Sequence, residues 1–265
     1  MIESTTNKKL KRIQKLLANA RFRRQEQAFA VEGWKLTAEA LSCGLVQTVY
    51  LSESSAAEWE ERAAFGGMAS PEGRPETELV SDRCFRGISD TVSPQGILAV
   101  VRMPQYDRGE ILTSADAAVL CLEDIQDPGN LGTMLRTAEG AGMSAVILSK
   151  GCVDLFNPKV VRAAMGALFR VPYFICDDVS TEVERLKNEG FSIYAAHPGG
   201  DRDFTEESYA GCVGIVVGNE ARGLSAPAVE GADYLVKIPM EGNLESLNAA
   251  VSAALLMYEI HRNRN

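Results

Sequence analysis

Three polar loops along the chain could together form a catalytic or binding site. They lie in the segments LEDIQDPGNLGTMLRTAEGAG (122–142), GIVVGNEARGLS (214–225) and IPMEGNLESLNAAVSAALLMYEI (238–260). Each loop follows an apolar, strand-like run and contains glycine, which lets a ligand approach the backbone closely. Ligands of open α/β sheets bind outside the carboxyl ends of the strands, so three such loops predict one shared site.

Two of these loops open helices, so their polar side chains also have a purely structural explanation. Asn130 follows the turn at 127–129 and could cap the helix after it. Asn243 or Ser246 could cap the last helix in the same way. A helix N-terminus also offers free N–H groups to a carboxylate or a phosphate. A cap does not explain Arg136, which stands on the first helix among apolar and small residues.

Other motifs do not indicate a second site. Gly140, Gly142 and Ala145 have the spacing G-x-G-x-x-A, but they close a helix and open a strand, the reverse of a dinucleotide fingerprint. A helix C-cap turn fits them better. His197 and His261 are the only histidines, and a lone histidine is more often structural than catalytic. The six cysteines form no C-x-x-C pair, so we expect no metal site and a reduced, cytoplasmic protein.

The charge of the chain is unevenly distributed. The net charge is −9, yet eight of the 27 Lys and Arg residues lie between Ser4 and Gln25, where none of the 36 acidic residues lies. Such a basic arm is either a solvated helix face or a contact surface for nucleic-acid phosphates. Its candidate RNA-binding residues are Lys8, Lys9, Lys11, Arg12, Lys15, Arg21, Arg23 and Arg24.

Composition and pattern divide the chain into two domains. Residues 1–102 contain the basic arm and a small α/β unit, residues 103–116 read as a linker, and residues 117–265 form the second domain. In the second domain, apolar strands without polar alternation are separated by helices, which predicts a parallel sheet covered on both faces. No apolar run reaches about 18 residues, so we expect no membrane span.

The expected elements follow from hydrophobic periodicity and turn signals. In the first unit they are a strand before 32, helices at 32–42, 54–68 and 81–90, strands at 46–51 and 95–101, and a loop at 69–76. In the second they are strands at 117–122, 144–148, 171–175, 191–196, 213–218 and 233–238, and helices at 130–141, 157–168, 179–189 and 246–261.

The last helix carries an apolar stripe that faces either a core or a partner. The stripe consists of Leu247, Ala250, Val251, Ala254, Leu255 and Tyr258.

The three motif segments, in this order, resemble the SpoU/TrmH family of RNA ribose 2′-O-methyltransferases, within the SPOUT superfamily. The segment NPKVVRAAMGALFRVP (157–172) is similar to the middle part of that family, and the resemblance covers about 117–262. Residues 1–102, with AFAVEGWKL and TVSPQGILAV, resemble the small substrate-binding domain that precedes it in many members, especially ribosomal RNA methyltransferases.

The resemblance implies a fold, a cofactor and partners. The fold is a parallel α/β sheet with a deep trefoil knot at its carboxyl end, an exception to the rule against knots. The cofactor is S-adenosylmethionine, and no metal is implied. The active site lies at the interface of a homodimer, and the substrate is ribosomal RNA in preference to tRNA. A non-catalytic RNA-binding protein of the same fold, and a methyltransferase with a target other than RNA, are the alternatives.

The resemblance also assigns residues by position. The catalytic positions are Asn130, Arg136, Glu220, Ser246 and Asn248. The cofactor-binding positions are Gly218, Asn219, Glu220, Ile238, Met240 and Leu247. Ala221 stands where many members have glycine, and a positive φ there would strain the loop. Because a free guanidinium is always protonated, we interpret Arg136 as a clamp for the substrate phosphate and not as a base.

Overall fold

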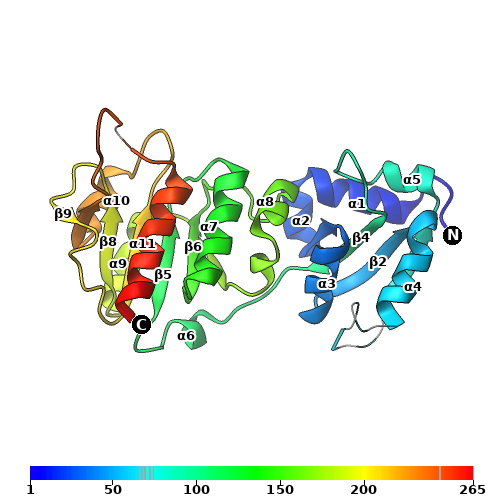
Figure 1. Cartoon of the computed structure of the whole chain (residues 1–265), viewed down its shortest axis with the longest axis horizontal. Coiled ribbons are helices and arrows are strands. Elements are labelled where there is room, and N and C mark those ends of the chain that lie inside the picture. The colour runs from blue at the N-terminus through cyan, green and yellow to red at the C-terminus, as the bar shows by residue number, and fades with distance from the viewer. Residues whose placement is uncertain are drawn as a thin grey trace. The chain divides into compact units, whose positions relative to one another are not determined.

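The computed structural model describes residues 1–64, 66, 68, 70–71, 73, 75–244 and 246–264. The chain forms two compact units (Figure 1). The first contains Met1–Gln105 and Phe156–Phe169, and the second contains Tyr106–Leu155 and Arg170–Asn265. The sequence placed the boundary within 103–116, and it assigned the segment 156–169 to the second domain.

The first unit is built on a four-stranded sheet. Its strands are β1 (Ala28–Glu32), β2 (Val46–Ser52), β3 (Glu76–Val80) and β4 (Ile97–Arg102), in the order β1-β4-β2-β3. β4 is antiparallel to β1 and β2, whereas β3 is parallel to β2. The sequence did not predict β3, because the prolines and charges before it are typical of a loop. Its hydrogen-bonding partner β2 lies far away in the sequence.

Helices cover both faces of this sheet. They are α1 (Lys8–Ala18), α2 (Ala20–Glu26), α3 (Trp34–Ser42), the 3₁₀ turn η1 (Glu53–Ser55), α4 (Ala56–Ala64) and α5 (Asp82–Arg86). The predicted helix at 54–68 and loop at 69–76 include positions 65, 67, 69, 72 and 74, which lie outside the described residues.

The basic arm consists of the two helices α1 and α2. Asn7 caps α1 and Asn19 caps α2, because each side chain accepts a hydrogen bond from a backbone N–H of the first turn. Leu10, Ile13 and Leu16 are buried against the sheet. The hydrophobic side of α1 therefore fixes the arm to the first unit and turns most of its cations outward.

The segment 156–169 packs in the first unit through aromatic rings. It contains α8 (Pro158–Ala164) and the 3₁₀ turn η2 (Ala167–Phe169). The ring of Phe29 on β1 lies 4.7 Å from that of Phe156 and 6.2 Å from that of Phe169, measured between centroids. These contacts join positions more than a hundred residues apart, so local patterns could not predict them.

The second unit contains a seven-stranded sheet, and every pairing in it is parallel. Its strands are β5 (Ala118–Leu122), β6 (Ala145–Ser149), β7 (Tyr173–Cys176), β8 (Ser192–Ala196), β9 (Arg202–Asp203), β10 (Val213–Val217) and β11 (Tyr234–Lys237). The order is β7-β6-β5-β10-β8-β11-β9. This confirms the predicted parallel α/β fold. The sequence did not predict the short strand β9.

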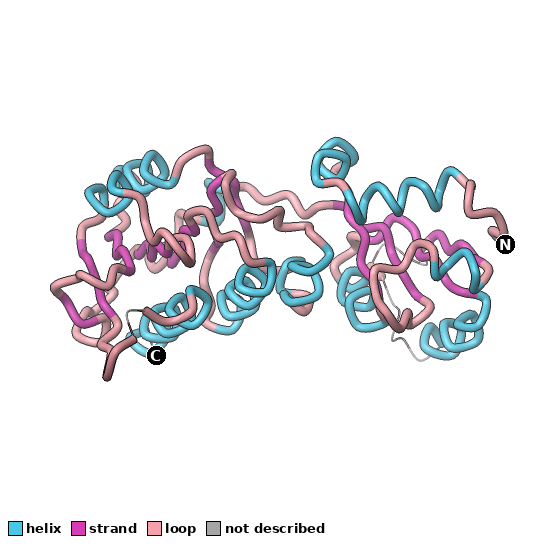
Figure 2. Tube along the Cα trace, turned by 90° about the horizontal axis from the view of Figure 1, so that it is seen from above, coloured by secondary structure: helices cyan, strands magenta, loops and turns pink. Residues whose placement is uncertain are grey.

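Helices flank this sheet, as Figure 2 shows from above. They are α6 (Arg108–Ile111), α7 (Pro128–Gly140), α9 (Val179–Asn188), α10 (Ala226–Gly231) and α11 (Ala249–Arg264). α9 and α10 contribute Val183, Leu186 and Ala228 to the core on one face, and α7 packs beside α11. The sequence did not predict α6 or α10. The last helix begins at Ala249, three residues later than predicted, so Ser246 lies in the loop before it.

The end of the chain crosses back over the sheet. It leaves β11, on the far side of β8 from β10, and passes through residues 238–248. α11 then packs on α7 and β10. A return crossing of this kind is a precondition for a knot at the end of the chain. No helix in the described part of the chain is long and apolar enough to span a membrane.

Candidate active site

The loop after β5 and the loop after β10 meet at the carboxylate of Glu220. Glu220 accepts hydrogen bonds from the side-chain amide of Asn130 (3.0 Å) and from the backbone N–H groups of Gln126 and Asp127 (3.3 Å each). Asp127 caps α7 by accepting from the backbone N–H of Asn130 at 2.7 Å. The predicted cap at Asn130 is therefore wrong. Because Asn130 does not cap the helix, its side chain can form hydrogen bonds with residues of the other loops.

The loop after β11 joins this cluster through Asn248. The Asn248 amide donates to Asn130 Oδ1 at 3.0 Å. Asn248 Oδ1 accepts from the backbone N–H groups of Ala250 (2.9 Å) and Val251 (3.3 Å), so Asn248, and neither Asn243 nor Ser246, caps α11. The three side chains Glu220, Asn130 and Asn248 form one chain of hydrogen bonds that links all three predicted loops.

The carboxylate of Glu220 is held in its charged form. Partial burial raises its pKa, but the hydrogen bonds from Asn130, Gln126 and Asp127 outweigh that effect, so the pKa lies below its usual 4.5. At neutral pH Glu220 is therefore an acceptor of hydrogen bonds. It orients the site and is unsuited to donate a proton.

Two predicted catalytic residues stand apart from this cluster. Arg136 is exposed on α7, six residues after Asn130, so the two side chains leave the helix about 120° apart. Ser246 is exposed in the loop before α11. Within the described part of the chain, neither side chain has a hydrogen bond or an ion pair. The structure thus brings Glu220, Asn130 and Asn248 together and leaves Arg136 and Ser246 open to a ligand or a partner.

Asn219 shapes the turn at 218–223, which carries three of the predicted cofactor positions. Asn219 Oδ1 accepts from the backbone N–H groups of Ala221 (2.9 Å) and Arg222 (3.0 Å), and Asn219 and Gly223 exchange two backbone hydrogen bonds. Gly223 supplies the left-handed residue, with φ +69. Ala221 is absent from the described residues with positive φ, so it stands in this turn without strain.

The other predicted cofactor positions lie in the loop between β11 and α11. Ile238, Met240 and Leu247 are half-buried there. Only β8 separates β11 from β10, so this loop and the turn at 218–223 leave the same edge of the sheet close together. No three His, Cys, Asp or Glu side chains in the described part are placed to hold a metal ion.

Comparison with known proteins matches both units to families. Residues 117–258 match the SpoU rRNA Methylase family, and residues 7–99 match the MRM3-like substrate binding domain. The chain is 34% identical over 260 residues, 98% of each sequence, to the 23S rRNA (guanosine(2553)-2′-O)-methyltransferase RlmP of Bacillus subtilis.

Solved structures agree with this match. The SpoU methyltransferase AviRb from Streptomyces viridochromogenes, in complex with AdoMet, has a TM-score of 0.86 at 27% identity, covering 97% of this chain and 98% of that one. A structure described as an RNA 2′-O ribose methyltransferase has a TM-score of 0.81 at 32% identity, covering 99% and 98%.

The chain belongs to the SpoU rRNA methylase family. This SpoU protein is thus an S-adenosylmethionine-dependent RNA methyltransferase with an N-terminal substrate-binding domain, as the motifs predicted. In the structure, the family's three motifs are the loops that Glu220, Asn130 and Asn248 join.

The basic arm of the SpoU protein contains cations of two kinds. Arg23 is buried, and its guanidinium donates to the carbonyl oxygens of Leu16 (2.6 Å) and Leu17 (3.1 Å) at the end of α1. We therefore remove Arg23 from the predicted RNA-binding residues.

Two exposed or half-exposed cations of the arm form ion pairs. Lys9 pairs with Glu76 and Glu78, and its hydrogen bonds to these carboxylates raise the pKa of the Lys9 ammonium. Arg12 pairs with Glu26 at 2.9 Å. The exposed cations without an acidic partner in the described part are Lys8, Lys11, Lys15, Arg21 and Arg24.

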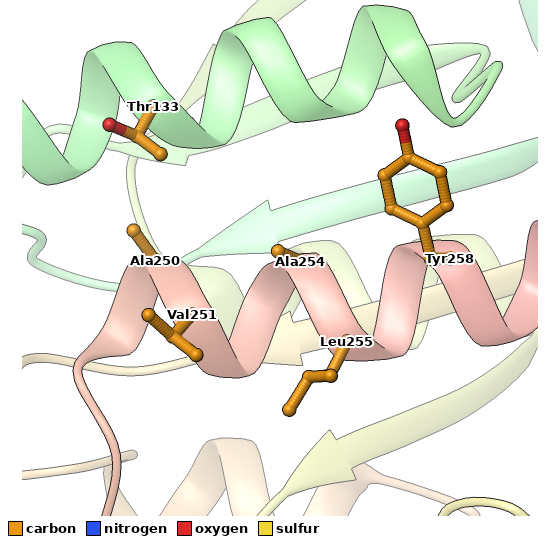
Figure 3. A pocket seen from close by; sticks show the side chains of 6 residues that line it. All are labelled: Thr133, Ala250, Val251, Ala254, Leu255 and Tyr258. Carbon is orange, nitrogen blue, oxygen red and sulfur yellow. The ribbon is translucent and has the colours of Figure 1, made fainter.

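The SpoU protein exposes an apolar face beside the site. On α11, Val251, Leu255 and Tyr258 have exposed fractions of 47%, 38% and 50%. These three side chains line a shallow hollow of about 310 Å³, shown in Figure 3. Its other lining residues are Ala250 and Ala254 of α11 and Thr133 of α7. Its first residues, Ala250 and Val251, are those whose N–H groups Asn248 caps. The stripe predicted on this helix is thus partly buried and partly open.

Replacing Gly218 with alanine is expected to destroy the turn that carries the cofactor positions. A Cβ at this position would lie 2.4 Å from the carbonyl carbon of Gly223 and 2.5 Å from the nitrogen of Leu224, and these backbone atoms cannot yield. Overpacking of this kind costs about 1–3 kcal/mol, so the melting temperature should fall by several degrees and S-adenosylmethionine binding should weaken. Calorimetry measures both.

Gly231→Ala is the matched control. The nearest atom to a Cβ there is Cγ1 of Val183 at 3.3 Å, which has to shift by much less than the backbone atoms beside Gly218. Cofactor binding by Gly218→Ala equal to that of Gly231→Ala would contradict the importance of the close approach at Gly218.

Sequence reasoning missed two residues that build this site. One is Asp127, and an aspartate directly before a proline at the first helical position is a recognisable capping signal. The other is Asp124, whose role depends on partners from two other loops. No local pattern indicates such partners.

Proposed function

We propose that the SpoU protein transfers the methyl group of S-adenosylmethionine to a ribose 2′-hydroxyl of ribosomal RNA, in the cytoplasm and as a homodimer. The observation that carries this proposal is the hydrogen-bonded chain Glu220–Asn130–Asn248, which ties the three motif loops into one site. Two exposed polar side chains of the same motif segments, Arg136 and Ser246, stand outside this chain of hydrogen bonds.

The choice of ribosomal RNA rests on coverage. The B. subtilis relative, named for 23S rRNA, matches both units of the chain. A structure described for 2′-OH methylation of C/U34 on tRNA covers 57% of this chain, with a TM-score of 0.52. The relative named for ribosomal RNA thus shares the substrate-binding unit of this chain, whereas the tRNA structure covers little more than half of the chain. This difference favours ribosomal RNA over tRNA as the substrate.

The reaction requires activation of a weak nucleophile. The ribose oxygen attacks the methyl carbon in line, the new C–O bond forms as the S–CH₃ bond breaks, and S-adenosylhomocysteine leaves with the electron pair. The 2′-hydroxyl must lose its proton in this step, and holding it in line with the methyl group lowers the barrier further. Arg136 holds the neighbouring phosphate with its planar fork and lowers the hydroxyl's pKa electrostatically, and the proton passes to phosphate or water.

In the proposed dimer, Arg136 lies against an active site. Arg136 lies about one turn after Thr133, the α7 residue that lines the apolar hollow, and its side chain leaves the helix about 120° away from that of its own Asn130. Pairing of two copies through the exposed side of α11 buries Val251, Leu255 and Tyr258 and brings Arg136 of each copy toward the interface. One catalytic centre then combines Arg136 of one protomer with the motif cluster of its partner.

A methyl-transfer assay tests the activity. The full chain is incubated with isotopically labelled S-adenosylmethionine and total RNA from a strain lacking the gene, and the label is mapped by nuclease digestion and mass spectrometry. We expect label at one 2′-O-methyl nucleotide of ribosomal RNA. Label in tRNA alone would overturn the substrate. If ribosomal assembly intermediates also remain unlabelled and calorimetry detects no cofactor binding, the chain is a non-catalytic RNA-binding protein.

Removing cations from the outer face of α1 is expected to weaken RNA binding. In the triple variant Lys8→Ala, Lys11→Ala, Lys15→Ala, the affinity should fall several-fold at low salt. The slope of log K against log salt should decrease by about 0.7–0.9 for each lost phosphate contact. Filter binding across a salt series measures both.

A second triple variant removes the same charge elsewhere. Lys150, Arg185 and Lys187 are cations of the second unit that pair with acidic side chains. Their replacement by alanine should leave the salt slope unchanged. Equal losses in the two variants would show that net charge, and not the arm, governs RNA binding.

A further inference from the structure

Asp124 adopts a backbone conformation that is rare for its residue type. It is the second residue after β5, and its φ is +55, in the left-handed region. Only four described residues other than glycine have a positive φ. Aspartate and asparagine tolerate this region better than most side chains, and such conformations persist where the surrounding structure fixes them, often at functional sites.

The backbone of Asp124 is bound by the turn that carries the cofactor positions. Its carbonyl oxygen accepts a hydrogen bond from the side-chain amide of Asn219 at 2.8 Å, and a second from the amide of Gln126 at 3.1 Å. The other end of the Asn219 side chain accepts the N–H groups of Ala221 and Arg222. The orientation of the Asp124 carbonyl group therefore fixes the position of the turn at 218–223.

The side chain of Asp124 holds this conformation in place. The hydroxyl of Ser149 donates to Asp124 Oδ1 at 2.8 Å and accepts from the Asp124 backbone N–H at 2.9 Å. The guanidinium of Arg222 lies 3.3 Å from Oδ2. Gly151 leaves room for the carboxylate, because a Cβ there would lie 1.8 Å from Oδ1. Asp124 thus ties together the loops after β5, β6 and β10.

We propose that Asp124 is a positioning residue for S-adenosylmethionine, acting through Asn219 on the turn at 218–223. It touches no reacting atom. Its carboxylate, anchored by Ser149, keeps the backbone left-handed, and the backbone carbonyl then anchors the turn. The inference rests on the proposed function, which requires S-adenosylmethionine, and on the prediction that the turn at 218–223 binds it. It goes beyond the motif residues, because the sequence assigned no role to Asp124.

Three substitutions separate the anchor from the backbone conformation. Asp124→Asn keeps a side-chain oxygen for Ser149 and tolerates the left-handed region. Asp124→Gly permits that region freely but removes the anchor. Asp124→Ala removes the anchor and disfavours the conformation.

The readout is the dissociation constant of S-adenosylmethionine for the full chain, measured by titration calorimetry. We expect the alanine and glycine variants to bind about tenfold or more weakly, because loss of a hydrogen bond to a charged group has an effect of about this size. The asparagine variant should stay within about threefold of the unmodified chain. In methyl transfer, KM for the cofactor should rise while kcat at saturating cofactor changes little.

Two further variants serve as controls. Arg222→Ala removes only the contact at 3.3 Å, on a side chain with 72% exposure, and should weaken binding by less than the loss of Asp124. Asp178→Ala removes a helix-capping aspartate from α9 in the same unit and should leave cofactor binding unchanged. Equal weakening by Asp178→Ala would show a loss of general stability and overturn the specific role.

The outcomes distinguish this inference from the proposed function. Cofactor binding by Asp124→Gly at the level of the unmodified chain would overturn the role of the carboxylate and leave the proposed function intact. Binding of S-adenosylmethionine without RNA methylation would contradict the proposed function, while the ranking of the Asp124 variants would still decide the inference. No binding by the unmodified chain would overturn both.

Discussion

Replacing Arg136 with alanine is expected to lower kcat for ribose methylation about 10²–10³-fold, the range for loss of a group that stabilises transition-state charge. S-adenosylmethionine binding should stay within about twofold of the unmodified value, because Arg136 lies outside the turn at 218–223 and the loop at 238–248. The reason is electrostatic: without the guanidinium, neither the phosphate nor the developing oxyanion has its cation. Single-turnover methylation of the mapped RNA, together with calorimetry, measures both quantities.

Two matched variants sharpen this prediction. Arg136→Lys keeps the charge and removes the planar fork, and its rate should fall between those of the unmodified chain and the alanine variant. Arg185→Ala removes an exposed arginine from α9 and should leave the rate unchanged. Near-normal rates for Arg136→Lys would argue against the fork, and near-normal rates for Arg136→Ala would remove Arg136 from the mechanism.

The second large effect is expected at the apolar face of α11. Val251 and Leu255 are exposed by 47% and 38%, and aspartate at either position would place a charge in the proposed dimer interface. In Val251→Asp together with Leu255→Asp, we expect a monomer by light scattering and a loss of methylation of at least about 10²-fold. The magnitude follows from the loss of the partner's Arg136.

Asn188→Asp provides the control, since it adds a charge at the exposed end of α9. It should change neither the mass in solution nor the rate. A monomeric chain before any substitution, or full activity of the double variant as a monomer, would contradict the dimer.

Mixed dimers test whether Arg136 acts on the partner's site. Each of the variants Arg136→Ala and Asn248→Ala should be inactive alone. If Arg136 completes the site of the partner, mixing the two restores one intact site per mixed dimer. If Arg136 acts within its own chain, each mixed dimer contains no intact site and the mixture stays inactive.

The sequence by itself determined the architecture of the second unit and the identity of its motif loops. Apolar strands alternating with helices predicted the parallel sheet, because strands buried on both faces lack polar alternation. Glu220, Asn130 and Asn248 follow three strands of that sheet, and parallel topology brings such loops to one edge. These inferences succeeded because hydrophobic periodicity is a local property, and because helical connections between successive strands favour parallel pairing.

Only the tertiary structure decided which polar group binds which partner. Asp127 and not Asn130 caps α7, and Asn248 and not Ser246 caps α11. Several polar side chains compete for the same helix N–H groups, and Glu220, about 90 residues away along the chain, settles the choice by engaging Asn130. A local sequence pattern shows which side chains could cap a helix. It does not show which of them a distant residue such as Glu220 will bind instead.

The same limit explains the residues whose surroundings the sequence could not indicate. Arg23 belongs to the basic segment that was predicted to bind RNA. Its side chain is nevertheless buried, and it donates hydrogen bonds to carbonyl groups at the end of α1. The segment 156–169 has the pattern of a crossover helix of the second unit, yet Phe29 of the first unit holds its aromatic rings. In both cases the stabilising contact is made across the fold, and its free energy depends on a geometry that exists only once the chain has folded.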